Sequence, residues 1–261
     1  MDRVLVITDS RGRDIHNFLS KELYVTTKVL PGAKIQEIAS VAKAEHVGKP
    51  FKLTVIAGGI CNLTHRETSK SIKCLRYDTD EETRRTKLEQ IKNTVLELQD
   101  SIKPVIFCTI TPASIVKYYK HHNAGKIHQK QAPETPTTEY QEEQTALQTD
   151  VKIINDFLIE NSINWNTKTV NWHKFSIRNS VTKNRRGRKK RIAKFVDTNI
   201  TDGVHFNKYL KQKCFEETLK VIKKRIVEEP QNEEETDSEL NTSQESISTW
   251  DFKRENKNEK K

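Results

Sequence analysis

Val4-Leu-Val-Ile-Thr-Asp-Ser-Arg-Gly-Arg13 is the stretch of sequence that decides the fold. Its apolar run, Val4–Ile7, is typical of a short buried strand and ends abruptly in polar residues, after which an amphipathic segment predicts a helix. In a parallel α/β sheet, the residues directly after a strand lie at the edge where ligands bind. Ser10 therefore stands where a nucleophile or a phosphate-binding hydroxyl would stand, although Asp9 and Ser10 also suit the N-cap of the following helix.

The composition bounds the class of protein. The 261 residues suffice for one α/β domain with extensions. Because 34% of them are apolar and 31% charged, we expect an ordinary core diluted by polar segments. The formal net charge of +10 favours anionic partners such as nucleic acid.

The cysteines and the apolar runs restrict the environment of the chain. Cys61, Cys74, Cys108 and Cys214 have the spacing of neither a zinc site nor a disulfide framework, so no metal or cofactor is predicted. The first apolar run is too short for a signal peptide, and no run approaches the roughly 20 residues that span a bilayer. We therefore expect an intracellular protein, cytoplasmic or nuclear, that binds no membrane.

Alternating strand and helix patterns predict a parallel sheet with helices on both faces. Beyond the first strand, strands are expected at 24–30, 53–57 and 105–110, with a fifth strand or its remnant at 169–173. Helices are expected at 33–46, around 88–98, at 138–161 and at 206–227. The predicted domain therefore covers residues 1–227, with an irregular insert at 113–138 and a basic loop at 178–198. Residues 228–261 are acidic and then Lys-rich with almost no apolar side chains, which predicts a disordered tail.

Chemically suggestive residues converge on one edge of this predicted sheet, because right-handed crossovers place every strand's carboxyl end there. They are Ser10, Gly32, the segment Gly58–Asn62, and the motif Asp202-Gly-Val-His205. A carboxylate three residues from a histidine is able to orient the imidazole, which then takes a proton from a serine hydroxyl. The glycines allow the close backbone approach that an oxyanion hole requires. A Gly-x-Ser-x-Gly elbow is absent, which argues against an ordinary α/β-hydrolase.

These blocks resemble those of the SGNH (GDSL-type) hydrolases. Thr8-Asp9-Ser10 corresponds to the family's Gly-Asp-Ser, Gly32 to its second-block glycine, and Asp202-Gly-Val-His205 to its Asp-x-x-His, over roughly residues 1–226. The resemblance implies a flavodoxin-like three-layer α/β/α sandwich with a parallel sheet of about five strands. It also implies hydrolysis of a small ester or acetyl group, with Ser10 as nucleophile, His205 as base and Asp202 as its partner. The backbone of Ser10 and Gly32, with a side-chain amide, would bind the oxyanion.

The chain departs from the family pattern in its third block. Gly59-Ile-Cys-Asn62 puts Cys61 at the position of the oxyanion asparagine, whereas a shift by one residue puts Asn62 there. A thiol is a poor donor, and loss of one oxyanion donor costs on the order of a hundred- to a thousand-fold in rate. Two hypotheses stay open: a weak esterase, or an SGNH scaffold used for binding.

A basic segment supports the second hypothesis. Its cationic residues are Arg185, Arg186, Arg188, Lys189, Lys190 and Arg191, which would contact the phosphates of RNA or single-stranded DNA. Tyr118, Tyr119, Trp165 and Trp172 would offer surfaces on which unpaired bases stack. A nuclear-localisation signal or a solvated loop has the same composition. The basic segment beside an intact triad resembles the SGNH-like domains of animal retrotransposon-encoded proteins and, more distantly, the RNA-binding domain of the insect protein Oskar.

Overall fold

The computed structural model describes residues 3–48, 51–133, 138–183 and 189–228; of residues 179–183, 189–193 and 228 it describes the backbone alone. The chain divides after Ile226, and Met1–Ile226 form one compact unit that contains the sheet. The predicted tail, 228–261, lies almost wholly outside the described residues, and its disorder stays a prediction. Within the described parts, no helix is both long and apolar enough to cross a bilayer.

The core of this unit is a parallel sheet of four strands in the described residues, in the order β2-β1-β3-β6. The strands are β1 (Val4–Thr8), β2 (Val25–Val29), β3 (Leu53–Ala57) and β6 (Val105–Phe107). Their register aligns Thr8 with Val29 on one side and with Ala57 on the other, so the strands end together at one edge. The expected fifth strand is reduced to a single parallel bridge between Cys108 and Val170.

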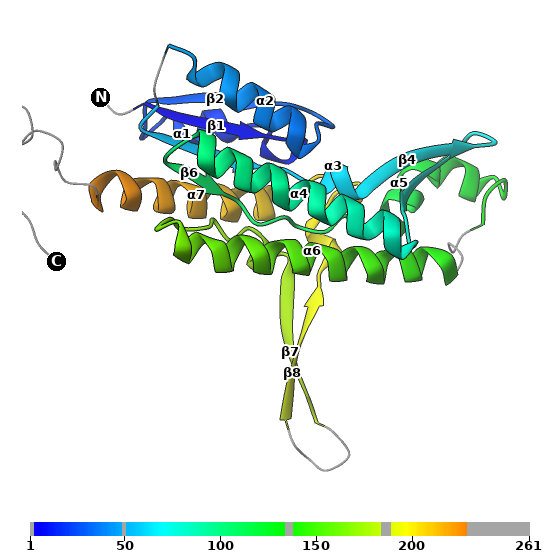
Figure 1. The fold of residues 1–261 in the computed structure, drawn as a ribbon. Helices are drawn as coiled ribbons and strands as arrows, with labels where there is room; N and C mark the ends of the chain where they lie inside the picture. The colour runs from blue at the N-terminus through cyan, green and yellow to red at the C-terminus, as the bar shows by residue number, and fades with distance from the viewer. Residues whose placement is uncertain (1–2, 49–50, 134–137, 184–188, 229–261) are drawn as a thin grey trace, which may run out of the picture. The chain divides into compact units, whose positions relative to one another are not determined.

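Helices cover both faces of the sheet (Figure 1). They are α1 (Ile15–Leu19), α2 (Ile35–His46), α3 (Ile60–Leu63), α4 (Glu81–Ser101), α5 (Ile115–His128), α6 (Thr138–Asn164) and α7 (Lys208–Glu228). Alternate β1 residues point to opposite faces. Leu5 and Ile7 pack with α2, α4 and α6, whereas Val4 and Val6 pack with α1 and α7. The predicted three-layer α/β/α sandwich is therefore confirmed.

Three segments differ from expectation. The supposedly irregular insert, 113–138, contains α5, whose buried face is formed by Ile115, Tyr118, Tyr119 and Asn123 rather than by an aliphatic stripe. The segment 64–77, for which no strand was expected, forms an antiparallel hairpin of β4 (Thr64–Ser69) and β5 (Ile72–Tyr77). The supposed basic loop, 178–198, is largely a second hairpin, β7 (Ile177–Lys183) and β8 (Lys189–Phe195). Three short 3-10 turns complete the described elements: η1 (Ser10–Gly12), η2 (His173–Phe175) and η3 (Asp197–Asn199).

Candidate active site

The turn after β1 places Ser10 at the carboxyl edge of the sheet. The backbone N–H of Asp9 donates to the carbonyl of Ala57 at 3.0 Å, which extends the strand pairing by one residue. The Asp9 carboxylate then caps η1 by accepting from the Arg11 N–H at 2.8 Å. Burial raises the pKa of Asp9, although the Arg11 guanidinium and N–H act in the opposite direction. Asp9 therefore does cap the turn, and Ser10, the first residue of η1, is left half-buried beside His205.

Ser10, His205 and Asp202 form a continuous chain of hydrogen bonds. The Oγ of Ser10 lies 3.1 Å from Nε2 of His205, and Nδ1 of His205 lies 2.7 Å from Oδ2 of Asp202. The other oxygen of Asp202, Oδ1, accepts from the N–H groups of Val204 at 3.0 Å and His205 at 2.8 Å. Burial alone would raise the pKa of Asp202, but these hydrogen bonds and the imidazole hold it well below its usual range.

The protonation pattern of the triad follows from that ionised carboxylate. A carboxylate only accepts hydrogen bonds, so Nδ1 of His205 carries the proton toward Asp202. Nε2 of the neutral ring then has a free lone pair for the Ser10 hydroxyl. This is the tautomer in which an imidazole acts as a general base toward a serine.

The loop that carries Asp202 and His205 packs closely against the start of α5. Gly203 has a φ of +90°, and a Cβ there would lie 2.4 Å from the backbone nitrogen of Tyr118 and 2.6 Å from the carbonyl oxygen of Ser114. The Ser114 N–H donates to the Gly203 carbonyl at 2.7 Å. Only glycine combines this backbone conformation with this approach, so Gly203 fixes the loop against a helix that the sequence did not predict.

Arg11 is a component of the site that sequence reasoning missed. Its side chain is only 3% exposed and contacts two other segments at the same edge. Nε donates to the carbonyl of Val204 at 3.1 Å, and Nη1 donates to the carbonyl of Thr111 and to its hydroxyl, the latter at 2.8 Å. The guanidinium also lies over the ring of Phe206, 5.4 Å from its centroid. Arg11 thus joins the Ser10 turn to the His205 loop.

A cleft of about 450 Å³ opens at the triad. Ser10, Gly32, Cys61, Val204 and His205 contribute to its walls. This volume lies within the range of small-molecule sites, roughly 300–1,000 Å³. The structure therefore brings two of the three predicted oxyanion residues, Gly32 and Cys61, to the same cavity as Ser10.

Asn62 is the predicted oxyanion residue that the structure turns away from the cleft. Its Oδ1 accepts from the Ile35 N–H at 2.8 Å, and its Nδ2 donates to the Gln36 side chain at 2.7 Å. Both groups are thus engaged at the start of α2, so the expectation that this amide faces the oxyanion is corrected. Cys61 occupies the cleft instead, and burial raises the pKa of its thiol, which keeps it protonated at neutral pH.

Backbone donors are available at the cleft. Among the described residues, no group accepts a hydrogen bond from the N–H of Ser10 or from the N–H of Gly32. Gly32 has a φ of +79°, which an L-residue adopts only under strain. An N–H without a partner at a cleft wall is the kind of group that stabilises a developing oxyanion.

The residues predicted to contact nucleic acid are only partly described. Arg185, Arg186 and Arg188 lie outside the described residues, and Lys189, Lys190 and Arg191 are on β8 without described side chains. Tyr118, Tyr119 and Trp172 are buried, so the expectation that they offer stacking surfaces is wrong. Trp165 packs against Phe107 and Phe157. Contact with nucleic acid through the basic segment stays a prediction.

Metal ligands do not cluster in the described parts of the chain. There, no group of three or more His, Cys, Asp or Glu side chains is arranged to hold an ion. The rings of His121 and His122 of α5 contact each other, and that of His122 also contacts Tyr118.

Comparison with known proteins gives matches at the level of structure. No family model matches the sequence, and no curated protein sequence is similar to it. A GDSL-like lipase from Bacteroides thetaiotaomicron superposes with a TM-score of 0.53 at 13% identity, covering 87% of this chain and 88% of that chain. The chain has the SGNH hydrolase fold. A second solved structure, described as that of an acylhydrolase from Bacteroides fragilis, superposes with a TM-score of 0.51 at 12% identity, covering 87% of each chain.

Proposed function

We propose that this SGNH-fold protein is a serine hydrolase that cleaves a small carboxylic ester, such as an acetyl ester. Ser10 is the nucleophile, His205 the general base and Asp202 the group that orients it. The observation that carries the proposal is the unbroken hydrogen-bond chain from Ser10 Oγ through both imidazole nitrogens to Asp202 at the wall of a cleft.

The first half of the proposed reaction forms an acyl-enzyme. Nε2 of His205 takes the proton from Ser10 Oγ as that oxygen attacks the ester carbonyl, and the carbonyl oxygen becomes an oxyanion. The ionised Asp202 stabilises the imidazolium that forms. Collapse of the tetrahedral intermediate breaks the ester C–O bond, and the imidazolium gives its proton to the departing alkoxide.

The second half regenerates the serine. A water molecule gives one proton to Nε2 of His205 and attacks the acyl carbonyl, and the second tetrahedral intermediate releases the carboxylic acid. The imidazolium returns the proton to Ser10 Oγ. The N–H groups of Ser10 and Gly32 are the proposed oxyanion donors, without a side-chain amide, since Asn62 is engaged by α2. We expect kcat to be about a hundred- to a thousand-fold lower than in an active site that has a third oxyanion donor from a side-chain amide.

Hydrolysis of p-nitrophenyl acetate tests the proposal directly. Wild-type protein, Ser10→Ala and the control Ser20→Ala, which changes an exposed serine at the end of α1, are compared after circular dichroism shows each to be folded. We expect turnover by the wild type and the control, and a background rate for Ser10→Ala. A fluorophosphonate probe followed by peptide mass spectrometry is expected to modify Ser10. Equal rates for all three proteins, with no modification at Ser10, would reject the proposal.

A further inference from the structure

Two arginines line the same cleft as the triad. Arg13 directly follows η1, which carries Ser10, and Arg66 belongs to β4. Both side chains are exposed to solvent. The walls of the cleft contain no aspartate or glutamate, whereas they contain these two guanidinium groups and the imidazole of His65. The cavity in front of Ser10 is therefore cationic.

Neither arginine is neutralised by a neighbour. Among the described residues, no carboxylate lies within ion-pair distance of Arg13 or Arg66. Nearby arginines behave differently: Arg76, Arg84 and Arg85 each have a carboxylate partner. The cleft thus holds two arginines without a counter-charge, unlike Arg76, Arg84 and Arg85.

The two acidic groups that raise the pKa of the Cys61 thiol, Asp9 and Glu37, have partners of their own. Asp9 caps η1, and Glu37 accepts from the Lys34 N–H at 2.7 Å. Asp202 bonds the far side of the His205 ring, away from Ser10. Among the described residues, no carboxylate therefore occupies the part of the cleft where an anionic ligand would bind.

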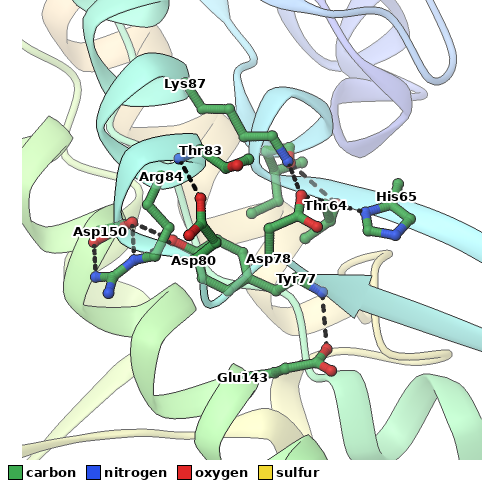
Figure 2. Close-up of polar contacts among 11 residues, drawn as sticks. Thr64, His65, Tyr77, Asp78, Asp80, Thr83, Arg84, Lys87, Glu143 and Asp150 are labelled. Atoms are coloured by element: carbon green, nitrogen blue, oxygen red, sulfur yellow. Dashed lines mark hydrogen bonds and ion pairs between the residues drawn. The ribbon is translucent and has the colours of Figure 1, made fainter.

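The wall that presents Arg66 is held by a polar network (Figure 2). β4 pairs with β5 in a register that puts Arg66 opposite Leu75. The Tyr77 N–H at the end of β5 donates to Glu143 of α6 at 2.8 Å. Asp78, just beyond, contacts both Lys87 of α4 and His65. Because these contacts tie the hairpin to α4 and α6, the backbone that carries Arg66 is fixed beside the triad.

We propose that the substrate is an anionic ester: an acyl ester that carries a phosphate or a carboxylate a few atoms from the scissile carbonyl. A guanidinium binds such oxygens with two parallel hydrogen bonds, and Arg13 and Arg66 approach the cleft from different elements. The anionic group binds these arginines, and the acyl carbon meets Ser10 Oγ. This inference rests on the proposed esterase function and defines its substrate class.

Matched esters test this inference. The first pair is 1-acetylglycerol 3-phosphate and 1-acetylglycerol; the second is acetoxyacetate and its methyl ester. Released acetate is measured for the wild type, Arg13→Gln, Arg66→Gln and the control Arg85→Gln, which changes an exposed arginine paired with Glu82 outside the cleft. We expect the wild-type kcat/KM to favour the phosphate ester, the carboxylate ester or both about ten-fold over the neutral partner. Each cleft variant should lose about ten-fold on the favoured ester and less than two-fold on its neutral partner. The pair that discriminates more identifies the anionic group.

A binding measurement separates failure of this inference from failure of the proposed function. Ser10→Ala protein is titrated with the same esters by calorimetry, with and without Arg66→Gln. Tighter binding of an anionic ester by Ser10→Ala, lost when Arg66→Gln is added, would support the anion site. If the wild type nevertheless released no acetate, only the esterase function would be rejected. Equal kcat/KM and equal affinity within both pairs would overturn the anionic-ester inference, and acetate release would then still support the esterase.

Discussion

Arg11 and Val204 are separated by 193 positions in the sequence, yet Arg11 Nε lies 3.1 Å from the carbonyl oxygen of Val204. Each residue is next to a member of the triad: Arg11 follows Ser10, and Val204 precedes His205. The hydrogen bond therefore sets the relative position of the nucleophile and the base. Burial lowers the pKa of Arg11, with Asp9 as the largest opposing influence. This residue is a positioning residue for the proposed reaction, not a catalytic one.

Arg11→Met is expected to lower kcat for p-nitrophenyl acetate by at least about 100-fold with little change in KM, because a small displacement of the base from the nucleophile is costly. It leaves acceptors at Val204 and Thr111 without donors, so the free energy of unfolding should fall by about 2–3 kcal/mol. Urea titration measures that loss. Arg11→Lys, which keeps the charge but not the fork of donors, should recover stability more than kcat. Equal recovery of both quantities would indicate a purely structural role.

Asp202→Asn is expected to lower kcat by about 10⁴-fold while the fold is retained, because the amide favours the wrong tautomer of His205. Stopped-flow or prolonged steady-state assays measure the remaining turnover. The matched control is Asp156→Asn, which removes an exposed ion-pairing carboxylate of α6 and should leave kcat unchanged. A loss below ten-fold in Asp202→Asn would contradict the proposed role of the carboxylate.

Asp202 also makes stability depend on pH. Its folded-state pKa is held below the unfolded value, so its contribution is complete above about pH 4 and is lost as the pH falls further. Urea unfolding between pH 5 and pH 3 should therefore show a smaller acid-induced loss in Asp202→Asn than in the wild type. Identical slopes for the two proteins over this range would count against a lowered pKa.

His173 gives a second pH dependence with its own window. Burial lowers the pKa of His173, so the folded state favours the neutral ring. Its contribution is complete above about pH 6.5 and declines as the pH falls, because the unfolded chain binds the proton more readily. The wild type should lose more stability than His173→Gln between pH 7.5 and pH 5.5. A larger acid-induced loss of stability in His173→Gln than in the wild type would contradict this explanation.

Gly203→Ala is expected to destabilise the protein by more than about 2 kcal/mol and to abolish activity, since the new Cβ meets the backbone of α5 at a φ of +90°. The matched control is Gly125→Ala, a change within α5 itself. A Cβ at Gly125 meets nothing within 4 Å, so this change should raise stability by about 0.5–1 kcal/mol. Thermal unfolding of both variants measures the contrast, and a neutral Gly203→Ala would show that the loop moves freely from α5.

Buried apolar runs made much of the fold predictable. β1 and β3 are buried along their whole length and consist mostly of apolar residues. A strand that helices cover on both faces is expected to have such a continuous apolar sequence. Because parallel strands end at the same edge of the sheet, the sequence alone predicts that Ser10 and His205 lie near each other at that edge. The β4–β5 hairpin gave no such signal, because β4 is exposed along almost its whole length and forms by pairing with β5.

The other differences between the predicted and the observed site arise from polar side chains that hydrogen-bond to the protein itself. Nothing in the sequence distinguishes Arg11 from the other cations, but its side chain is buried and makes three hydrogen bonds to distant segments. Asn62 is one of the two residues that the third block offers as the oxyanion side chain, but its amide bonds the first turn of α2. Such partners are distant in the sequence, so neither spacing nor composition reveals them.

Ser10 and His205 come from opposite ends of the compact unit, 195 positions apart. During synthesis on the ribosome, Ser10 leaves the exit tunnel well before His205, which is among the last segments of the unit to emerge. A nascent or truncated chain that stops before the Asp202 loop contains Ser10 without the proposed base. If the proposed triad is active, labelling of Ser10 by an active-site probe reports that translation and folding of the unit are complete, and the triad then serves as an internal marker of maturation.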